Sequence, residues 1–193
     1  MFDLFEESNK TSLPFDLPED ADFSVSEIEQ HSGFHIKVPN GELFYAEHFF
    51  NKIISDRCVE YFLETENNVL QKSDWHTCCE EALKQIPFKN IQWQHDKLNM
   101  YGKTVYLPRY SAWYGDNDKS YSYSGITLQP NKWNNGLLFL KEQIEKIANV
   151  NFNSVLMNWY RDGEDYINWH TDAEKELGRN PIIASLNNSI ASS

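Results

Sequence analysis

The sequence predicts an α+β fold built on an antiparallel sheet, and three observations carry that prediction. Segments with an apolar side chain at every third or fourth position, typical of amphipathic helices, all lie before residue 150. Segments that alternate apolar and polar side chains, typical of half-buried strands, dominate after it. Asn40-Gly41 and Asp162-Gly163 offer positive-φ residues for tight turns between such strands. Helices and strands that are segregated along a chain in this way favour an α+β class.

The first 33 residues are predicted to be an acidic, mobile arm outside the core. Residues 1–30 hold nine Asp or Glu side chains and one Lys, so they carry a charge of −8 out of −12 for the whole chain. Two prolines and the lack of a sustained apolar period also favour an irregular segment. Residues 34–193 are predicted to form one domain, which is long enough to bury a core without disulfides.

The ordered part of the chain is expected to begin with a hairpin and a helix. Residues 34–38 alternate apolar and polar side chains, and the Asn40-Gly41 turn would connect them to an apolar strand at residues 43–45. A helix fits residues 51–65, because apolar side chains recur there at every fourth position and share one face.

Two more helices and a strand region follow. Helices are predicted over residues 74–86 and 134–148, and strands between residues 91 and 106. The first of these helices carries Cys78 and Cys79 on its apolar stripe, so we interpret them as core side chains; a reactive or metal-bound pair is the alternative.

The composition also indicates the kind of cellular compartment in which the chain is expected to reside. Three cysteines make neither a disulfide framework nor a spaced zinc site, which favours a reducing compartment such as the cytoplasm or nucleus. No secretory signal is visible, and no stretch approaches the roughly 18 apolar residues of a membrane span. Net acidity argues against binding nucleic acid through overall charge, although residues 84–109 hold five basic side chains against one acid.

The end of the chain carries the candidate chemistry, on a predicted strand at residues 153–160, an Asp-Gly turn and a second predicted strand at residues 166–172. Because side chains alternate along a strand, His170 and Asp172 are expected to project into the same space. An imidazole and a carboxylate are two of the three ligands of the facial triad that holds Fe(II). Asn158 and Tyr160, two apart on the preceding strand, could add an amide and a phenol. The alternative is a solvated His-Asp pair beside ordinary strand polarity.

Longer motifs give these residues a context. From about residue 34 to 186 the chain resembles the AlkB family of Fe(II)- and 2-oxoglutarate-dependent nucleic-acid dealkylases, with about 90 residues in matching order. The segments that carry the resemblance are 99–103, Pro108-Arg109, Trp113-Tyr114-Gly115-Asp116, Tyr121-Ser122-Tyr123-Ser124-Gly125, Pro130, Trp133, 153–163, His170-Thr171-Asp172, 174–178 and the predicted strand 181–186.

The resemblance implies roles for individual residues. His170 and Asp172 would bind Fe(II), and Asn158 and Tyr160 would hydrogen-bond the co-substrate 2-oxoglutarate. The remaining matched residues fall where the family contacts a flipped base or the nucleic-acid backbone. In such contacts an apolar side chain fills the gap that the flipped base leaves, and cationic side chains bind phosphates. These implied substrate-binding residues are Tyr121, Tyr123, Ser124, Glu174, Met100, Tyr101, Gly102 and Arg109, with Lys97 and Lys103 beside them.

The implied fold is a double-stranded β-helix, or jelly roll, with helices packed on the sheet. The implied activity is oxidative demethylation of 1-methyladenine and 3-methylcytosine in DNA or RNA, whose weakened pairing makes base flipping less costly. No membrane partner is implied. Residues 1–5 also look like short acidic-aromatic peptides that dock on bacterial sliding clamps, with a solvated tail as the alternative.

The sequence departs from the family pattern in three places. Ala173 stands where the family often has a further acid after the iron-binding Asp, and residues 67–90 look like an insertion. No His follows His170, and the last Arg is Arg179, so the second metal His and the Arg that binds 2-oxoglutarate are missing. We therefore expect a C-terminally incomplete barrel that is not an efficient dioxygenase. The alternative function is a truncated, catalytically incompetent fragment that retains at most nucleic-acid binding.

Overall fold

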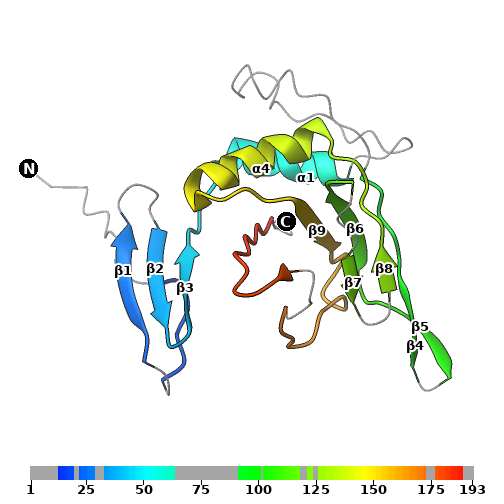
Figure 1. Ribbon diagram of the computed structural model, residues 1–193, viewed down its shortest axis with the longest axis horizontal. Helices are drawn as coiled ribbons and strands as arrows, with labels where there is room; N and C mark the ends of the chain where they lie inside the picture. Colours follow the sequence, from blue (N-terminus) through cyan, green and yellow to red (C-terminus); the bar gives the residue numbers. More distant parts are fainter. Residues whose placement is uncertain are drawn as a thin grey trace, which may run out of the picture. The chain divides into compact units, whose positions relative to one another are not determined.

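A computed structural model describes residues 13–19, 22–28, 33–63, 91–100, 102–117, 121–123, 126–172 and 177–188 (Figure 1). The chain divides into two compact units, Met1–Lys52 and Ile53–Ser193. The helix predicted over residues 74–86, with its two cysteines, and the clamp-like residues 1–5 lie outside the described residues.

The first unit is a three-stranded antiparallel sheet in the order β1-β2-β3, made of β1 (Ser24–Ile28), β2 (Gly33–Val38) and β3 (Gly41–Tyr45). The predicted β2–β3 hairpin is confirmed, but its turn begins earlier than expected. Val38 pairs with Gly41, so Pro39 and Asn40 make the turn, and Gly41 belongs to the strand. Pro39 explains the shift, because its fixed φ suits the first central position of a turn.

Strand β1 lies within the range that was expected to be a mobile arm. All five of its residues pair with β2, with Val25 opposite Ile36, which is 1% exposed and forms the core of this unit. The acidic composition of residues 1–30 predicted an irregular segment. Net charge does not show whether a short segment will pair with a neighbouring strand, and here β2 supplies that partner. The ordered sheet therefore begins before residue 34.

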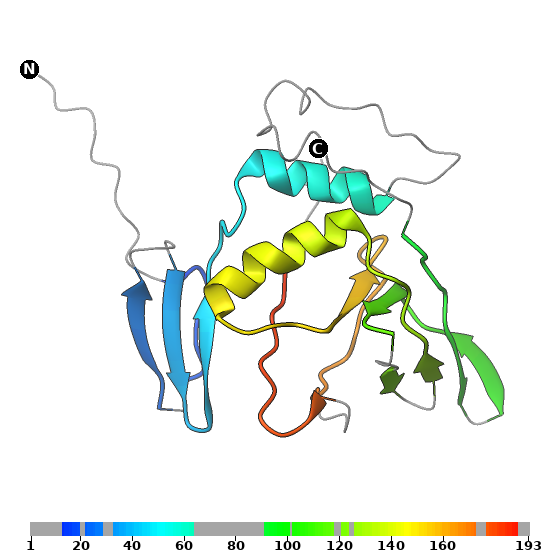
Figure 2. The same ribbon diagram turned by 45° about the horizontal axis from the view of Figure 1, so that its top comes forward.

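The second unit packs two helices on one face of a strand pair. Strands β6 (Tyr110–Gly115) and β9 (Ser154–Trp159) pair in antiparallel register, and α1 (Lys52–Leu63) and α4 (Asn135–Ala148) lie side by side next to them (Figure 2). Both helices confirm the sequence prediction. The core between these layers is made of Ile91, Ala112, Tyr114, Leu137 and Met157, with Phe62, Trp93, Trp133 and Val155 packed around them.

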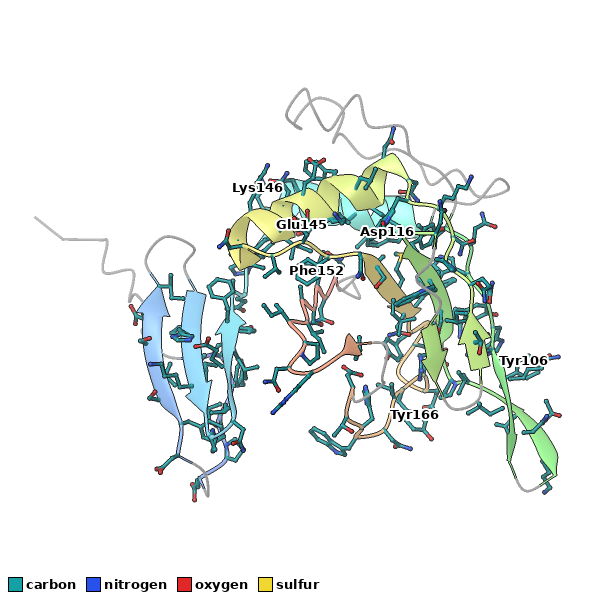
Figure 3. All side chains as sticks on the ribbon, viewed as in Figure 1. Tyr106, Asp116, Glu145, Lys146, Phe152 and Tyr166 are labelled. Atoms are coloured by element: carbon teal, nitrogen blue, oxygen red, sulfur yellow. The ribbon has the colours of Figure 1, made fainter. Side chains whose placement is uncertain are left out.

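Helix α4 has recognisable end signals. The Asn134 side chain accepts a hydrogen bond from the Leu137 backbone N–H at 2.9 Å, and Asn149 ends the helix in the left-handed conformation, with φ of 52°. Glu145 then connects the helix to the segment that follows, because its Oε1 accepts from the Phe152 N–H at 2.6 Å and pairs with Lys141 at 2.8 Å (Figure 3). These contacts lower the pKa of the Glu145 carboxyl.

Two short hairpins complete the unit. Strand β4 (Lys97–Met100) pairs with β5 (Lys103–Tyr106), and β7 (Tyr121–Tyr123) pairs with β8 (Ile126–Leu128). The strands predicted between residues 91 and 106 are thus confirmed from residue 97 onward. Within the described ranges, no helix is long and apolar enough to cross a membrane.

Two predicted strands are wrong. Residues 166–172 and 181–186 adopt no regular secondary structure, and the partner of β9 is β6 rather than the segment after the Asp-Gly turn. Alternation shows which side chains would share a face, but it does not select the neighbouring strand that must supply the hydrogen bonds. Among the described residues, one backbone hydrogen bond, from Tyr166 N–H to Pro108 O at 3.1 Å, connects this segment to the loop between β5 and β6.

Candidate active site

The face of the β6–β9 pair turned away from the helix-packed core carries the first group of candidate residues. Asn158 pairs with Ser111 across the two strands, and the Ser111 hydroxyl donates to Asn158 Oδ1 at 3.4 Å. Ser111 is 2% exposed, whereas Asn158 is exposed. Trp113, Leu128 and Leu156 form a small apolar cluster beside them. The Asn158 amide is thus held on one side and open on the other.

The turn after Tyr160 is fastened by an ion pair that the sequence did not reveal. Arg161 donates through Nε and Nη2 to the two carboxylate oxygens of Asp165, both at 2.6 Å, and its backbone N–H donates to the same carboxylate at 3.0 Å. These hydrogen bonds lower the pKa of Asp165 to about 2 and raise the pKa of Arg161 above its usual range. The guanidinium also lies 5.2 Å from the centre of the Tyr110 ring. The turn is therefore held against β6.

The structure brings His170 and Asp172 together beyond this turn. His170 Nε2 lies 3.4 Å from Asp172 Oδ1, and each side chain is about half exposed. The other ring nitrogen of His170, Nδ1, lies 2.9 Å from the Asn168 carbonyl oxygen. A carbonyl oxygen can only accept, so Nδ1 carries a proton, and Nε2 is the ring nitrogen that remains to bind a metal ion beside the carboxylate.

This pair fits a metal ion as two of its ligands. Two donors bound at right angles to one ion, each at about 2.1 Å, lie about 3 Å apart, which is close to the observed separation. A backbone carbonyl on the far ring nitrogen is the usual way in which a protein orients a ligating histidine. Across the described ranges, no group of three or more His, Cys, Asp or Glu side chains could hold a metal ion, so the pair is without a third such ligand there.

Asn158 and Tyr160 are not joined to this pair. Tyr160 follows the last residue of β9 and is 40% exposed. Among the described residues, no hydrogen bond connects Asn158 or Tyr160 with His170 or Asp172. The roles implied for these four residues stay predictions.

The predicted substrate-binding residues are only partly described. Tyr121 and Tyr123 lie on β7, Met100 ends β4, and Gly102 has φ of 76° in the turn of the β4–β5 hairpin. Arg109 is 8% exposed, and its Nε atom has no hydrogen-bond partner among the residues that the structure describes. A buried donor without an acceptor is uncommon in folded proteins. Tyr101, Ser124 and Glu174 lie outside the described residues.

Aromatic side chains next to the turn were also missed. His95 stacks on Tyr110 with ring centres 4.4 Å apart, and Tyr110 packs on Trp159 at 5.5 Å. Only strand pairing brings these rings together, since they come from separate parts of the chain. Their one signal in the sequence was the density of aromatic residues.

Comparison with known proteins supplies the family. Residues 63–190 match the 2OG-Fe(II) oxygenase superfamily. The chain is similar to alpha-ketoglutarate-dependent dioxygenase alkB homolog 3 of Bos taurus, at 44% identity over 55% of this chain and 35% of the relative, and of Homo sapiens, at 39% over 61% and 38%. It is also similar to the DNA oxidative demethylase ALKBH2 of Bos taurus, at 38% over 47% and 32%.

The match therefore covers about a third of the length of these relatives. Fe(II) and 2-oxoglutarate are the metal and co-substrate after which the matched superfamily is named. The superfamily match, residues 63–190, covers well over half of this chain and includes β6, β9, His170 and Asp172. The chain belongs to the 2OG-Fe(II) oxygenase superfamily and, within it, to the AlkB family.

Proposed function

We propose that this chain carries part of the active site of an AlkB-type nucleic-acid demethylase. The arrangement of the His170 ring supports the proposal most. Its Nδ1 donates a hydrogen bond to the Asn168 carbonyl oxygen, and its Nε2 lies 3.4 Å from Asp172 Oδ1. That arrangement prepares one nitrogen and one oxygen for the same ion, and this donor set matches non-haem Fe(II).

In this proposal His170 and Asp172 hold Fe(II), and Asn158 and Tyr160 hold 2-oxoglutarate. Ser111 would keep the Asn158 amide in place, because its hydroxyl already donates to Asn158 Oδ1. The Asn158 Nδ2 group and the Tyr160 hydroxyl can then donate to the carboxylate and carbonyl oxygens of the co-substrate. With dioxygen, the loaded site would supply oxidation of an N-methyl group on the base.

The substrates proposed are 1-methyladenine and 3-methylcytosine in DNA or RNA. The relatives are named as dioxygenases and as DNA oxidative demethylases, which supports a nucleic-acid substrate for this chain. We propose that Tyr121, Tyr123, Ser124 and Glu174 line the base pocket, and that the Met100-Tyr101-Gly102 tip enters the duplex. The hairpin position of Gly102 supports the second role, because a protruding turn can act as a wedge.

We further propose that the β6–β9 pair belongs to a double-stranded β-helix of the superfamily type. Superfamily membership and the mixed arrangement of helices and antiparallel strands support this fold. Because the described residues contribute two metal ligands and no third, metal binding by this chain is expected to be weak.

A metal titration tests the assignment. Mn(II), an oxygen-stable substitute for Fe(II), is added with 2-oxoglutarate, and binding is followed by the EPR signal of free Mn(II). His170→Ala and Asp172→Asn are each expected to lower the affinity at least tenfold, whereas His35→Ala, which removes a histidine of the first unit, is the matched control. Equal affinity in wild type and both site variants would remove the metal assignment.

A further inference from the structure

The β4–β5 hairpin carries an exposed aromatic ring beside a cation. Lys97 pairs with Tyr106 across the two strands, so their side chains share one face, and Lys97 Nζ lies 4.7 Å from the ring centre. Tyr106 is 51% exposed. Figure 3 shows its ring pointing away from the strands, and Figure 1 shows the hairpin extending beyond β6 and β9.

The exposed ring is the end of a continuous row of aromatic side chains. His95 lies 4.6 Å from Tyr106 and 4.4 Å from Tyr110 between ring centres, and its Nε2 donates to the Leu107 carbonyl at 2.8 Å. The row continues through Trp159, which lies 5.5 Å from Tyr110, to Trp93 at 5.7 Å. Because His95 packs on Tyr110 of β6, which in turn packs on Trp159 of β9, Tyr106 is held in place, and a ligand that stacks on it would lose little side-chain entropy.

Packing in a core does not explain why an aromatic residue stands at position 106. Val105, whose side chain lies on the opposite face of the hairpin, is 48% exposed, so neither face of the outer strand is covered. The face with Tyr106 also presents Asn99 and Thr104, which hydrogen-bond to each other at 2.8 Å. An aromatic face, a cation and an amide thus lie together on a two-stranded projection.

The charge of the hairpin indicates the class of ligand. Lys97 and Lys103 are both exposed, on a chain with a net charge of −12, so this hairpin is a local basic site. A phosphate would attract the Lys97 ammonium away from the ring, and a base could then stack on the ring face that the ammonium now covers. A base is flat and has a π-face whatever its identity, so such a site would tolerate any sequence.

We propose that Tyr106, with Lys97, forms a stacking site for one base of single-stranded nucleic acid outside the catalytic pocket. This inference rests on the proposed function, because it adds a second contact to the same class of substrate. Lys97 would contact the adjoining phosphate, and His95 would support the ring from within the protein. The site needs neither metal nor 2-oxoglutarate.

Fluorescence anisotropy with a labelled oligothymidine, in buffer that contains EDTA, tests the proposal. Tyr106→Leu is expected to weaken binding by about 5- to 150-fold, which is the loss of one stacked base, and Tyr106→Trp is expected to retain it. Lys97→Gln is expected to reduce the slope of log K against log salt by about 0.7, the value for one phosphate contact on a single strand. Val105→Thr, on the other face of the same hairpin, is the matched control.

The outcomes separate this inference from the proposed function. Unchanged affinity of Tyr106→Leu, equal losses in Tyr106→Leu and Val105→Thr, or a wild type that binds no oligothymidine would each overturn the stacking site. His35→Ala, which removes a histidine of the first unit, is expected to bind the oligothymidine as wild type does. If the chain bound oligothymidine through Tyr106 but bound no Mn(II), the stacking site would stand and the proposed metal site would fall.

Discussion

The buried side chain of Arg109 allows a prediction in which stability and binding change in opposite directions. Arg109 is 8% exposed, and no acceptor for its Nε lies within the described part of the chain. An unsatisfied buried donor costs about 1–3 kcal/mol, and more when it belongs to a charged group. Arg109→Met keeps an apolar stem of similar length and removes that donor. We therefore expect the free energy of unfolding to rise by about 1 kcal/mol, the lower end of this range, since some packing is lost.

Urea unfolding followed by tryptophan fluorescence measures this change, and a rise of about 2–4 °C in Tm is the corresponding thermal result. Lys103→Met removes a charge from an exposed position and is the control, expected to stay within about 0.5 kcal/mol of wild type. The same Arg109→Met protein is expected to bind single-stranded nucleic acid more weakly, because the resemblance to the AlkB family implies that Arg109 contacts the substrate. A loss of about 2 kcal/mol or more would refute the reasoning, since it would mean that the guanidinium is well paired.

Two further predictions concern the ion pair in the turn after Tyr160 and the cap at the start of helix α4. The folded-state pKa of Asp165 is about 2, below its ordinary value of 3.8, so the stabilisation from its pairing with Arg161 is present above pH 3.8 and is lost as the pH falls toward 2. Asp165→Asn should thus destabilise the protein at pH 7 and flatten its stability curve between pH 4 and pH 2; an acid dependence identical to wild type would contradict this. Asn134→Ala removes the cap on the Leu137 N–H and is expected to cost about 1 kcal/mol in urea unfolding, with no effect on Mn(II) affinity. A variant as stable as wild type would show that the cap is dispensable.

Local periodicity was enough to predict the elements that bury one face. Helix α4 has apolar side chains at helical spacing together with Asn residues at both ends, so pattern and caps agree. The β2–β3 hairpin was also predictable, although Pro39 and not Gly41 determined the turn. Strand β1 was missed, because strong acidity masked its five residues, whose pairing depends on β2.

Long-range pairing could not be predicted from the same patterns. Residues 166–172 alternate as a strand would, yet β9 pairs with β6, and side-chain alternation alone cannot select that partner. The closeness of His170 and Asp172 was predictable, because two residues of separation keep them together in any extended backbone. The Arg161–Asp165 pair and the row from Tyr106 to Trp93 depend on the turn and on the register of the sheet, and so only the structure revealed them.

The central claim is that His170 Nε2 and Asp172 Oδ1 are ligands of one metal ion. Pulsed EPR of bound Mn(II), in protein whose histidine rings are labelled with ¹⁵N, tests this claim most directly. We predict coupling to one imidazole nitrogen, which is present in wild type and in His35→Ala and absent in His170→Ala. Bound Mn(II) without nitrogen coupling in wild type, or with the same coupling after His170→Ala, would contradict the claim.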